Sequence, residues 1–165
     1  MVLQYDHQII QGRSKVSWHG SIDENWDNNI ASLPDALLDR ADFYFTDIEN
    51  INSIGIRLWT QFINEVSYNR HIEFWDCPSL IVRLLSVSDA FKGSATIRSF
   101  FVALDCPNCE AELAIRYSTD QKFETIAEEV ANFTCKGCQS KMSFQDDPDI
   151  YESFLKDSST SGSNS

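Results

Sequence analysis

The stretch that decides the fold is residues 42–66, DFYFTDIENINSIGIRLWTQFINEV. Residues 42–48 are rich in aromatic and β-branched side chains, which predicts a buried strand. After a loop at 49–52, apolar side chains recur at helical spacing, and this predicts a helix from about Ser53 to Asn69 with one apolar stripe. The positions of that stripe are Ile56, Trp59, Phe62, Ile63 and Val66. A strand followed at once by such a helix is typical of an α/β fold.

The segment before this stretch predicts further strands. Residues 1–20 fit two short strands around a turn at Gln11-Gly12. A helix is then expected to begin at Ser21-Ile22-Asp23, with Trp26, Ile30 and Leu33 as its apolar positions.

The segment after the central helix continues the alternation. Residues 71–76 read as a strand, and Pro78 suits the first turn of another helix. A further strand, 96–104, runs directly into Cys106. The order β-β-α-β-α-β-α over residues 1–100 predicts a mixed sheet covered by helices.

Two cysteine pairs follow this domain, Cys106-Pro107-Asn108-Cys109 and Cys135-Lys136-Gly137-Cys138. Two residues between cysteines let a tight turn aim both sulfurs at one tetrahedral ion, and Gly137 is expected to take the left-handed conformation in its turn. Four thiolates in this pattern predict a closed, structural Zn²⁺ site. Iron in the same ligand set, a redox pair and four free thiols are the alternatives. The fifth cysteine, Cys77, is expected to be a small buried side chain.

The cysteine pairs define the second half of the chain. Short strand-like runs at 113–117, 133–134 and 142–144 surround them, so residues 101–147 predict a small β-rich zinc ribbon. Its apolar positions look too sparse for a core of its own, and the metal is expected to hold it together. Residues 148–156 predict a short helix that either covers the first sheet or caps the ribbon. Residues 157–165, mostly Ser, Thr, Gly and Asn, predict a disordered tail.

The charge of the chain bears on its partners. The formal net charge is −12, and residues 101–147 hold nine acidic side chains against four basic ones. Phosphate backbones and anionic membrane surfaces repel such a protein, so neither nucleic acid nor membrane insertion is expected. The sequence shows no secretion signal and no apolar run long enough to span a bilayer, and we expect a cytoplasmic protein.

The residues 47–56, DIENINSIGI, resemble the motif of the STAS domain, which occurs in anti-sigma factor antagonists and in sulfate transporters. The resemblance covers residues 1–100 and implies a STAS-like fold. It matches Ser53 to the serine that a partner kinase phosphorylates, with Asn52, Ile54 and Gly55 on the surrounding partner surface. The family has Asp where this sequence has Asn52, and Ser or Thr where it has Ile54. The alternative is that Ser53 is only a helix cap.

These features predict a non-enzymatic signalling or adaptor protein whose partner resembles an anti-sigma factor kinase or a sensor protein. The three histidines, His7, His19 and His71, lie in no catalytic motif, and no phosphate-binding glycine loop is present. A zinc-ribbon scaffold in a transcription or translation assembly is the alternative function, and an enzyme whose site forms no motif is the third.

Overall fold

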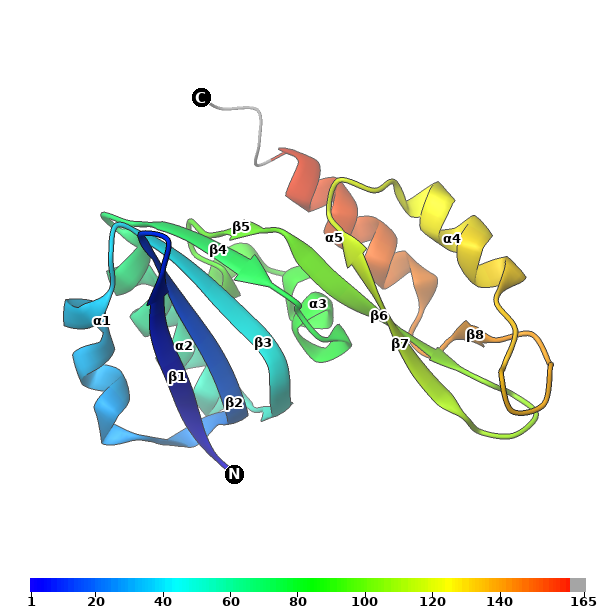
Figure 1. Cartoon of the computed structure of the whole chain (residues 1–165), viewed down its shortest axis with the longest axis horizontal. Helices are drawn as coiled ribbons and strands as arrows, with labels where there is room; N and C mark the ends of the chain where they lie inside the picture. The colour runs from blue at the N-terminus through cyan, green and yellow to red at the C-terminus, as the bar shows by residue number, and fades with distance from the viewer. Residues whose placement is uncertain (161–165) are drawn as a thin grey trace.

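Five strands form the first sheet of the computed structural model, which describes residues 1–160. Their order is β1-β2-β3-β4-β5 (Figure 1). They span Val2–Ile10, Arg13–Trp26, Arg40–Ile51, His71–Trp75 and Thr96–Ile97. β1 runs antiparallel to β2, and the other neighbours are parallel, so the predicted mixed sheet is confirmed. The β1–β2 turn lies where it was predicted, with Gln11 and Gly12 both at positive φ, as a type I′ hairpin turn requires.

The helices bury one face of this sheet. α2 (Ser53–Ser67) occupies the predicted position and buries Trp59, Phe62, Ile63 and Val66. Its Trp59 ring lies 5.0 Å from the ring of Trp18 on β2. α1 (Leu33–Ala36) lies next to η1 (Asn28–Ser32), and α3 (Ser79–Leu85) packs mainly against α5 (Pro148–Thr160) and against β6 (Ser99–Asp105) of the second sheet. The core is therefore an aromatic cluster between the sheet and α2, in which edge-to-face ring contacts add to the burial of apolar area.

The helix predicted to begin at Ser21-Ile22-Asp23 is wrong, because β2 continues to Trp26. Ile22 is fully buried and pairs with Ile51 of β3, while Trp26 pairs with Leu3 of β1. Pairing to a strand on each side outweighs the helix-capping preference of the local sequence. Helical structure begins only at the 3₁₀ turn η1 (Asn28–Ser32), where Asp27 accepts a hydrogen bond from the amide of Asn29. A second 3₁₀ turn, η2 (Asp89–Phe91), follows α3.

Three strands form the second sheet, in the order β7-β6-β8. β6 spans Ser99–Asp105, β7 spans Glu112–Ser118 and β8 spans Ser143–Phe144. The chain between β7 and the second cysteine pair forms α4 (Phe123–Asn132), a helix that the sequence analysis missed. α4 buries Ile126 and Val130. This region therefore has more apolar core than its sequence suggested.

The last helix, α5, spans Pro148–Thr160 and covers the second sheet. The Phe154 ring lies 5.0 Å from the ring of Phe100 on β6, and the Tyr151 hydroxyl accepts a hydrogen bond from the Ala103 amide at 3.2 Å. α5 also packs against α3, so it covers the second sheet and contacts an element that precedes that sheet. The tail predicted to be disordered from Asp157 is wrong as far as Thr160, because α5 continues through these residues. Residues 161–165 lie outside the described part of the chain.

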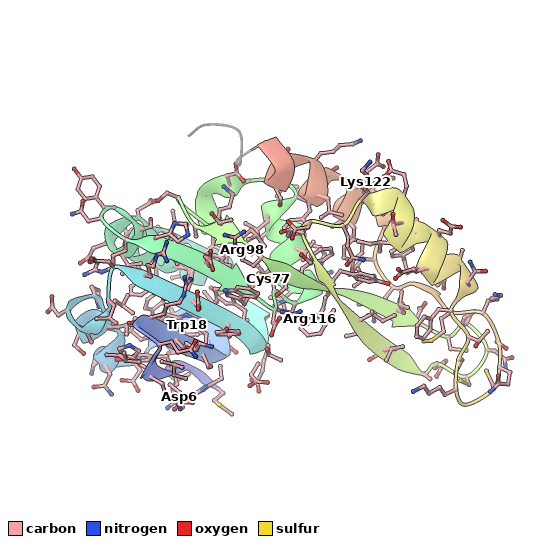
Figure 2. The ribbon with its side chains drawn as sticks, turned by 45° about the horizontal axis from the view of Figure 1, so that its top comes forward. Asp6, Trp18, Cys77, Arg98, Arg116 and Lys122 are labelled. Atoms are coloured by element: carbon pink, nitrogen blue, oxygen red, sulfur yellow. The ribbon has the colours of Figure 1, made fainter. Side chains whose placement is uncertain are left out.

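One extended segment belongs to both sheets. β5 pairs with β4, β6 pairs with β7, and only Arg98 separates β5 from β6. Figure 2 shows Arg98, Cys77 and Arg116 at this junction. Cys77 is buried, as expected, and its backbone pairs with Phe100 of β6. Arg116 of β7 reaches back to Asp76 with an Nε–Oδ1 distance of 2.6 Å. The two sheets are thus joined by strand pairing and an ion pair.

An ionic cluster lies on the sheet face opposite α2. Glu73, only 6% exposed, accepts hydrogen bonds from Arg13 at 2.9 Å and from Arg98 at 2.6 Å, and Arg13 also binds Asp42. Burial opposes ionisation of Glu73, but hydrogen bonds from Arg98 and His71 and the charges of both arginines outweigh it. The pKa of Glu73 is therefore lowered.

Candidate functional site

Two turns of the same shape carry the four cysteines. In the first, the Glu110 amide donates to the Cys106 carbonyl at 2.9 Å, and in the second the Gln139 amide donates to the Cys135 carbonyl at 2.9 Å. Positive φ falls on Glu110 and Gln139, the residues after the second cysteine of each pair. Gly137 is not among the residues with positive φ, so the left-handed conformation predicted for it is wrong. In each turn, the backbone takes the left-handed conformation at the residue that follows the second cysteine.

The four cysteines form one cluster. All four sulfurs, from Cys106, Cys109, Cys135 and Cys138, lie within 4.8 Å of one another. Two sulfur–sulfur contacts join the two turns, with Cys106 Sγ 3.4 Å from Cys138 Sγ and Cys109 Sγ 3.5 Å from Cys135 Sγ. Zinc–sulfur bonds of about 2.3 Å in a tetrahedron place the sulfurs about 3.8 Å apart. The predicted cluster is therefore confirmed as a group that can hold a metal ion.

Polar groups around the sulfurs favour thiolates. The backbone amides of Cys138 and Gly137 lower the pKa of Cys135. The side chains of Ser140 and Asn108 lower the pKa of Cys138 to about 5. The Ala111 amide also favours the Cys109 thiolate, but the neighbouring cysteines outweigh it and raise the pKa of Cys109 to about 12. Four adjacent thiolates repel one another, and a bound dication removes that conflict.

The cluster lies at the end of the molecule away from the first sheet (Figure 1). Cys106 and Cys135 are buried, and Cys109 is exposed. The ion would join two chain segments that are also connected by the pairing of β6 with β8 and by a hydrogen bond from Ser143 to Asp105. A four-sulfur site with no open ligand position is typical of a structural metal.

The start of α2 holds the other predicted residues. Asn52 is the N-cap, and its Oδ1 accepts a hydrogen bond from the Gly55 amide at 2.8 Å. Its Nδ2 donates to Glu24 at 2.7 Å, which ties the cap to the end of β2. Ser53 is the first residue of the helix and is exposed. The alternative that Ser53 serves as the helix cap is therefore wrong, because Asn52 has that role.

Ile54 and Gly55 differ in exposure. The Ile54 side chain is 43% exposed, whereas Gly55 is buried. A Cβ on Gly55 would lie 1.8 Å from the Ile22 carbonyl oxygen. Only glycine allows α2 to approach β2 this closely. Of the four predicted surface residues, Ser53 and Ile54 are exposed, Asn52 is half-buried, and Gly55 is buried, so the prediction of Gly55 on the partner surface is wrong.

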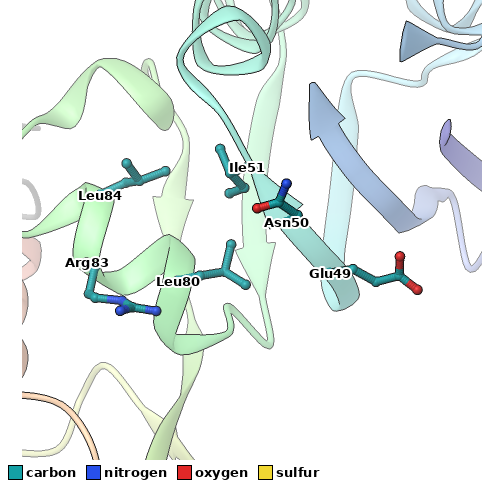
Figure 3. A pocket seen from close by; sticks show the side chains of 6 residues that line it. All are labelled: Glu49, Asn50, Ile51, Leu80, Arg83 and Leu84. Carbon is teal, nitrogen blue, oxygen red and sulfur yellow. The ribbon is translucent and has the colours of Figure 1, made fainter. Parts of the chain in front are cut away.

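A pocket beside this surface has no counterpart in the sequence analysis. It lies between the end of β3 and α3 and has a volume of about 370 Å³ (Figure 3). Its lining residues are Glu49, Asn50, Ile51, Leu80, Arg83 and Leu84. These residues come from elements far apart in the chain, so no local pattern could have indicated the pocket.

No helix within residues 1–160 has both the length and the apolar character needed to cross a bilayer. Neither a protein-family model nor a curated protein matches this chain.

Proposed function

We propose that this chain is a non-enzymatic adaptor of a signalling pathway, which binds a protein partner through the start of α2. The observation that carries the proposal is Ile54, an apolar side chain 43% exposed beside Ser53 on a helix start whose backbone is fixed. The Asn52 cap and the tight contact of Gly55 with β2 hold this surface in one conformation. A preformed apolar surface lowers the ordering cost of binding.

Phosphorylation of Ser53 is the proposed switch. A phosphate at the first residue of α2 would lie near unpaired amides and the positive end of the helix dipole, so the helix would tolerate it. The same dianion beside Ile54 would have to lose water when the partner docks, and this weakens binding. The resemblance to STAS domains makes an ATP-binding kinase of the anti-sigma factor type the first partner to test.

The proposed metal is zinc, in a structural role. The four thiolates match the closed Cys₄ ligand set of structural zinc sites. Elemental analysis of purified protein should find about one zinc per chain. A chain loaded with iron and coloured accordingly would contradict this assignment. Reduced thiols are kept in reducing compartments, which supports a cytoplasmic location.

The test of the partner surface compares two matched substitutions. Partners are identified from lysate with the wild-type chain, and the affinity of the purified partner is then measured by calorimetry. Ile54→Glu should weaken binding at least about 30-fold, the loss typical of a central interface residue. Val87→Glu places the same charge on an apolar side chain that is 82% exposed elsewhere, and it should leave affinity unchanged.

Ser53→Asp and Ser53→Ala test the switch separately. The aspartate variant should bind the partner more weakly than the alanine variant, because only aspartate adds charge to the interface. Equal affinities for both variants would remove the switch from the proposal. If neither position 53 nor position 54 affects affinity, the partner surface is elsewhere.

A further inference from the structure

β3 is longer than the strand beside it. β4 pairs with β3 only from Arg40↔His71 to Tyr44↔Trp75, whereas β3 continues to Ile51 and stays paired with β2 on its other side. Among the described residues, no strand pairs with residues 45–51 on the β4 side. The chain leaves β4 at Asp76, which has a φ of 56°, and turns toward α3. The second half of β3 is therefore an internal sheet edge with an open row of backbone donors and acceptors.

Solvent reaches this edge. Thr46, Asp47, Glu49 and Asn50 are exposed, while Ile48 turns into the core. The register between β2 and β3 is irregular here, since shifts fall between Ser17 and His19 and between Gly20 and Ser21. Bulges of this kind bend a strand and change where its edge points. The side chains of these four residues on the open stretch of β3 are thus accessible to another molecule.

α3 forms a wall opposite this edge. In Figure 3, Leu80 and Leu84 extend from α3 toward β3, and Ile51 lies on the strand side. The groove between them has a volume of about 370 Å³, within the range of roughly 300–1,000 Å³ that is usual for binding sites. A groove bounded by a free strand edge and a helix is the geometry that accepts an added peptide strand. Backbone groups then provide affinity, and alternate side chains fill the groove.

The charges near the groove indicate which kind of peptide segment would bind there. The chain has no Lys or Arg in residues 16–39 or in residues 41–56, which include the carboxyl ends of β2 and β3. Asp47 and Glu49 lie on the exposed stretch of β3, and the N-terminal ammonium of Met1 lies 3.7 Å from Glu49 Oε2, so Asp47 is the acid of this stretch without an ion pair among the described residues. Arg83 is the base among the lining residues, and it pairs with Asp146 at 3.4 Å. Charge complementarity therefore favours a basic strand over an acidic one.

We propose that an extended, basic segment of a partner protein adds to β3 between Phe45 and Ile51 as a new strand. Its alternate apolar side chains pack against Leu80 and Leu84, and its lysine or arginine side chains face the acidic end of the sheet. This inference rests on the proposed adaptor function, because the edge ends at Ile51, two residues before Ser53. It specifies the shape and charge of the segment that docks there.

The test uses a labelled peptide of about eight residues with alternating lysine and valine. Its affinity for the full chain is measured by fluorescence anisotropy at about 0.15 M salt. The control peptide has the same sequence with alternate backbone nitrogens methylated, which keeps the charge but removes the edge hydrogen bonds. We expect the methylated peptide to bind at least about tenfold more weakly.

Groove variants and hydrogen exchange locate the bound peptide. Leu84→Gln should weaken binding by about tenfold because it removes an apolar wall, whereas Val87→Gln, which lies just beyond α3, should change it less than about twofold. Saturating peptide should slow amide exchange in residues 46–51 and leave β1 unchanged. Equal binding of both peptides, absence of binding at millimolar concentration, or protection at β1 would each overturn the inference. Protection, in the free chain, of the amides in residues 46–51 that point away from β2 would also overturn it, because the edge would then already be occupied.

The identified partner separates this inference from the proposed function. If Ile54→Glu weakens partner binding and Leu84→Gln does not, the α2 surface stands and the strand addition fails. If only Leu84→Gln weakens it, the strand addition stands and the α2 surface fails.

Discussion

Replacing Gly55 with alanine tests the contact that positions the start of α2. Two effects oppose each other. Alanine is the better helix former by about 1 kcal/mol, which would stabilise the chain. However, the new Cβ would lie 1.8 Å from the Ile22 carbonyl oxygen and 2.6 Å from the Asp23 amide nitrogen. Both neighbours are backbone atoms that cannot rotate away, so the helix start has to withdraw by more than about 1 Å, at an overpacking cost of about 3 kcal/mol.

The net expectation is a loss of about 2 kcal/mol, or a melting temperature lower by about 4–8 °C for a chain of this size. Withdrawal would also break the hydrogen bond from the Asn52 amide to the Ile22 carbonyl, now 3.1 Å. Thermal unfolding followed by circular dichroism measures the change. Ser53→Ala, at an exposed position two residues earlier, should shift the unfolding free energy by less than about 0.5 kcal/mol. If the Gly55→Ala chain is as stable as wild type, helix propensity determines its stability, and the close contact between α2 and β2 does not require glycine.

Three further perturbations address the metal, the ionic cluster and α5. A strong chelator at neutral pH should speed amide exchange in residues 106–111 and 135–140. α2 should stay protected, because the aromatic core does not contain the metal site. Simultaneous loss of protection in α2 would refute this expectation. The lowered pKa of Glu73 contributes stability that is present above its ordinary value of 4.5 and lost as pH falls through the folded value. Urea unfolding should therefore show a smaller loss between pH 7 and pH 3 for Glu73→Gln than for wild type, and parallel losses would argue against it. Tyr151→Phe removes a hydroxyl that accepts a hydrogen bond from the Ala103 amide and donates one to Asp146 at 3.2 Å. The free energy of unfolding should fall by about 1–2 kcal/mol in the same assay. An unchanged free energy would mean that water replaces the hydroxyl.

The cysteine cluster could be predicted from sequence because its geometry is local. Two residues between cysteines define each turn, and four sulfurs suit one ion, so the pattern needs no knowledge of the remaining fold. The strand at 42–48 and the helix from Ser53 were also predictable locally, the strand from its aromatic and β-branched content and the helix from the spacing of its apolar residues.

Two elements were predicted wrongly from the sequence. The first is determined by long-range strand pairing, and the second is a helix whose apolar spacing was overlooked. Residues 21–26 are polar enough to resemble a helix start, but β1 and β3 pair with them and keep them extended. α4 could have been recognised, because Phe123, Ile126 and Val130 recur at helical spacing. It lacked a capping side chain, since Lys122 stands at its N-cap. The groove beside β3 depends on β3 being longer than β4, and no local pattern encodes that difference.

The segment that belongs to both sheets would make a metal ion held by the four cysteines a fixed spectroscopic reference for the whole molecule. Because β5 runs into β6 with only Arg98 between them, no linker separates the cysteine cluster from α2. Cobalt(II) occupies the same thiolate geometry as zinc and is paramagnetic. Pseudocontact shifts from that ion would therefore report the position of nuclei near Ser53 and along β3. A bound partner could be located on this surface by nuclear magnetic resonance without attaching a tag.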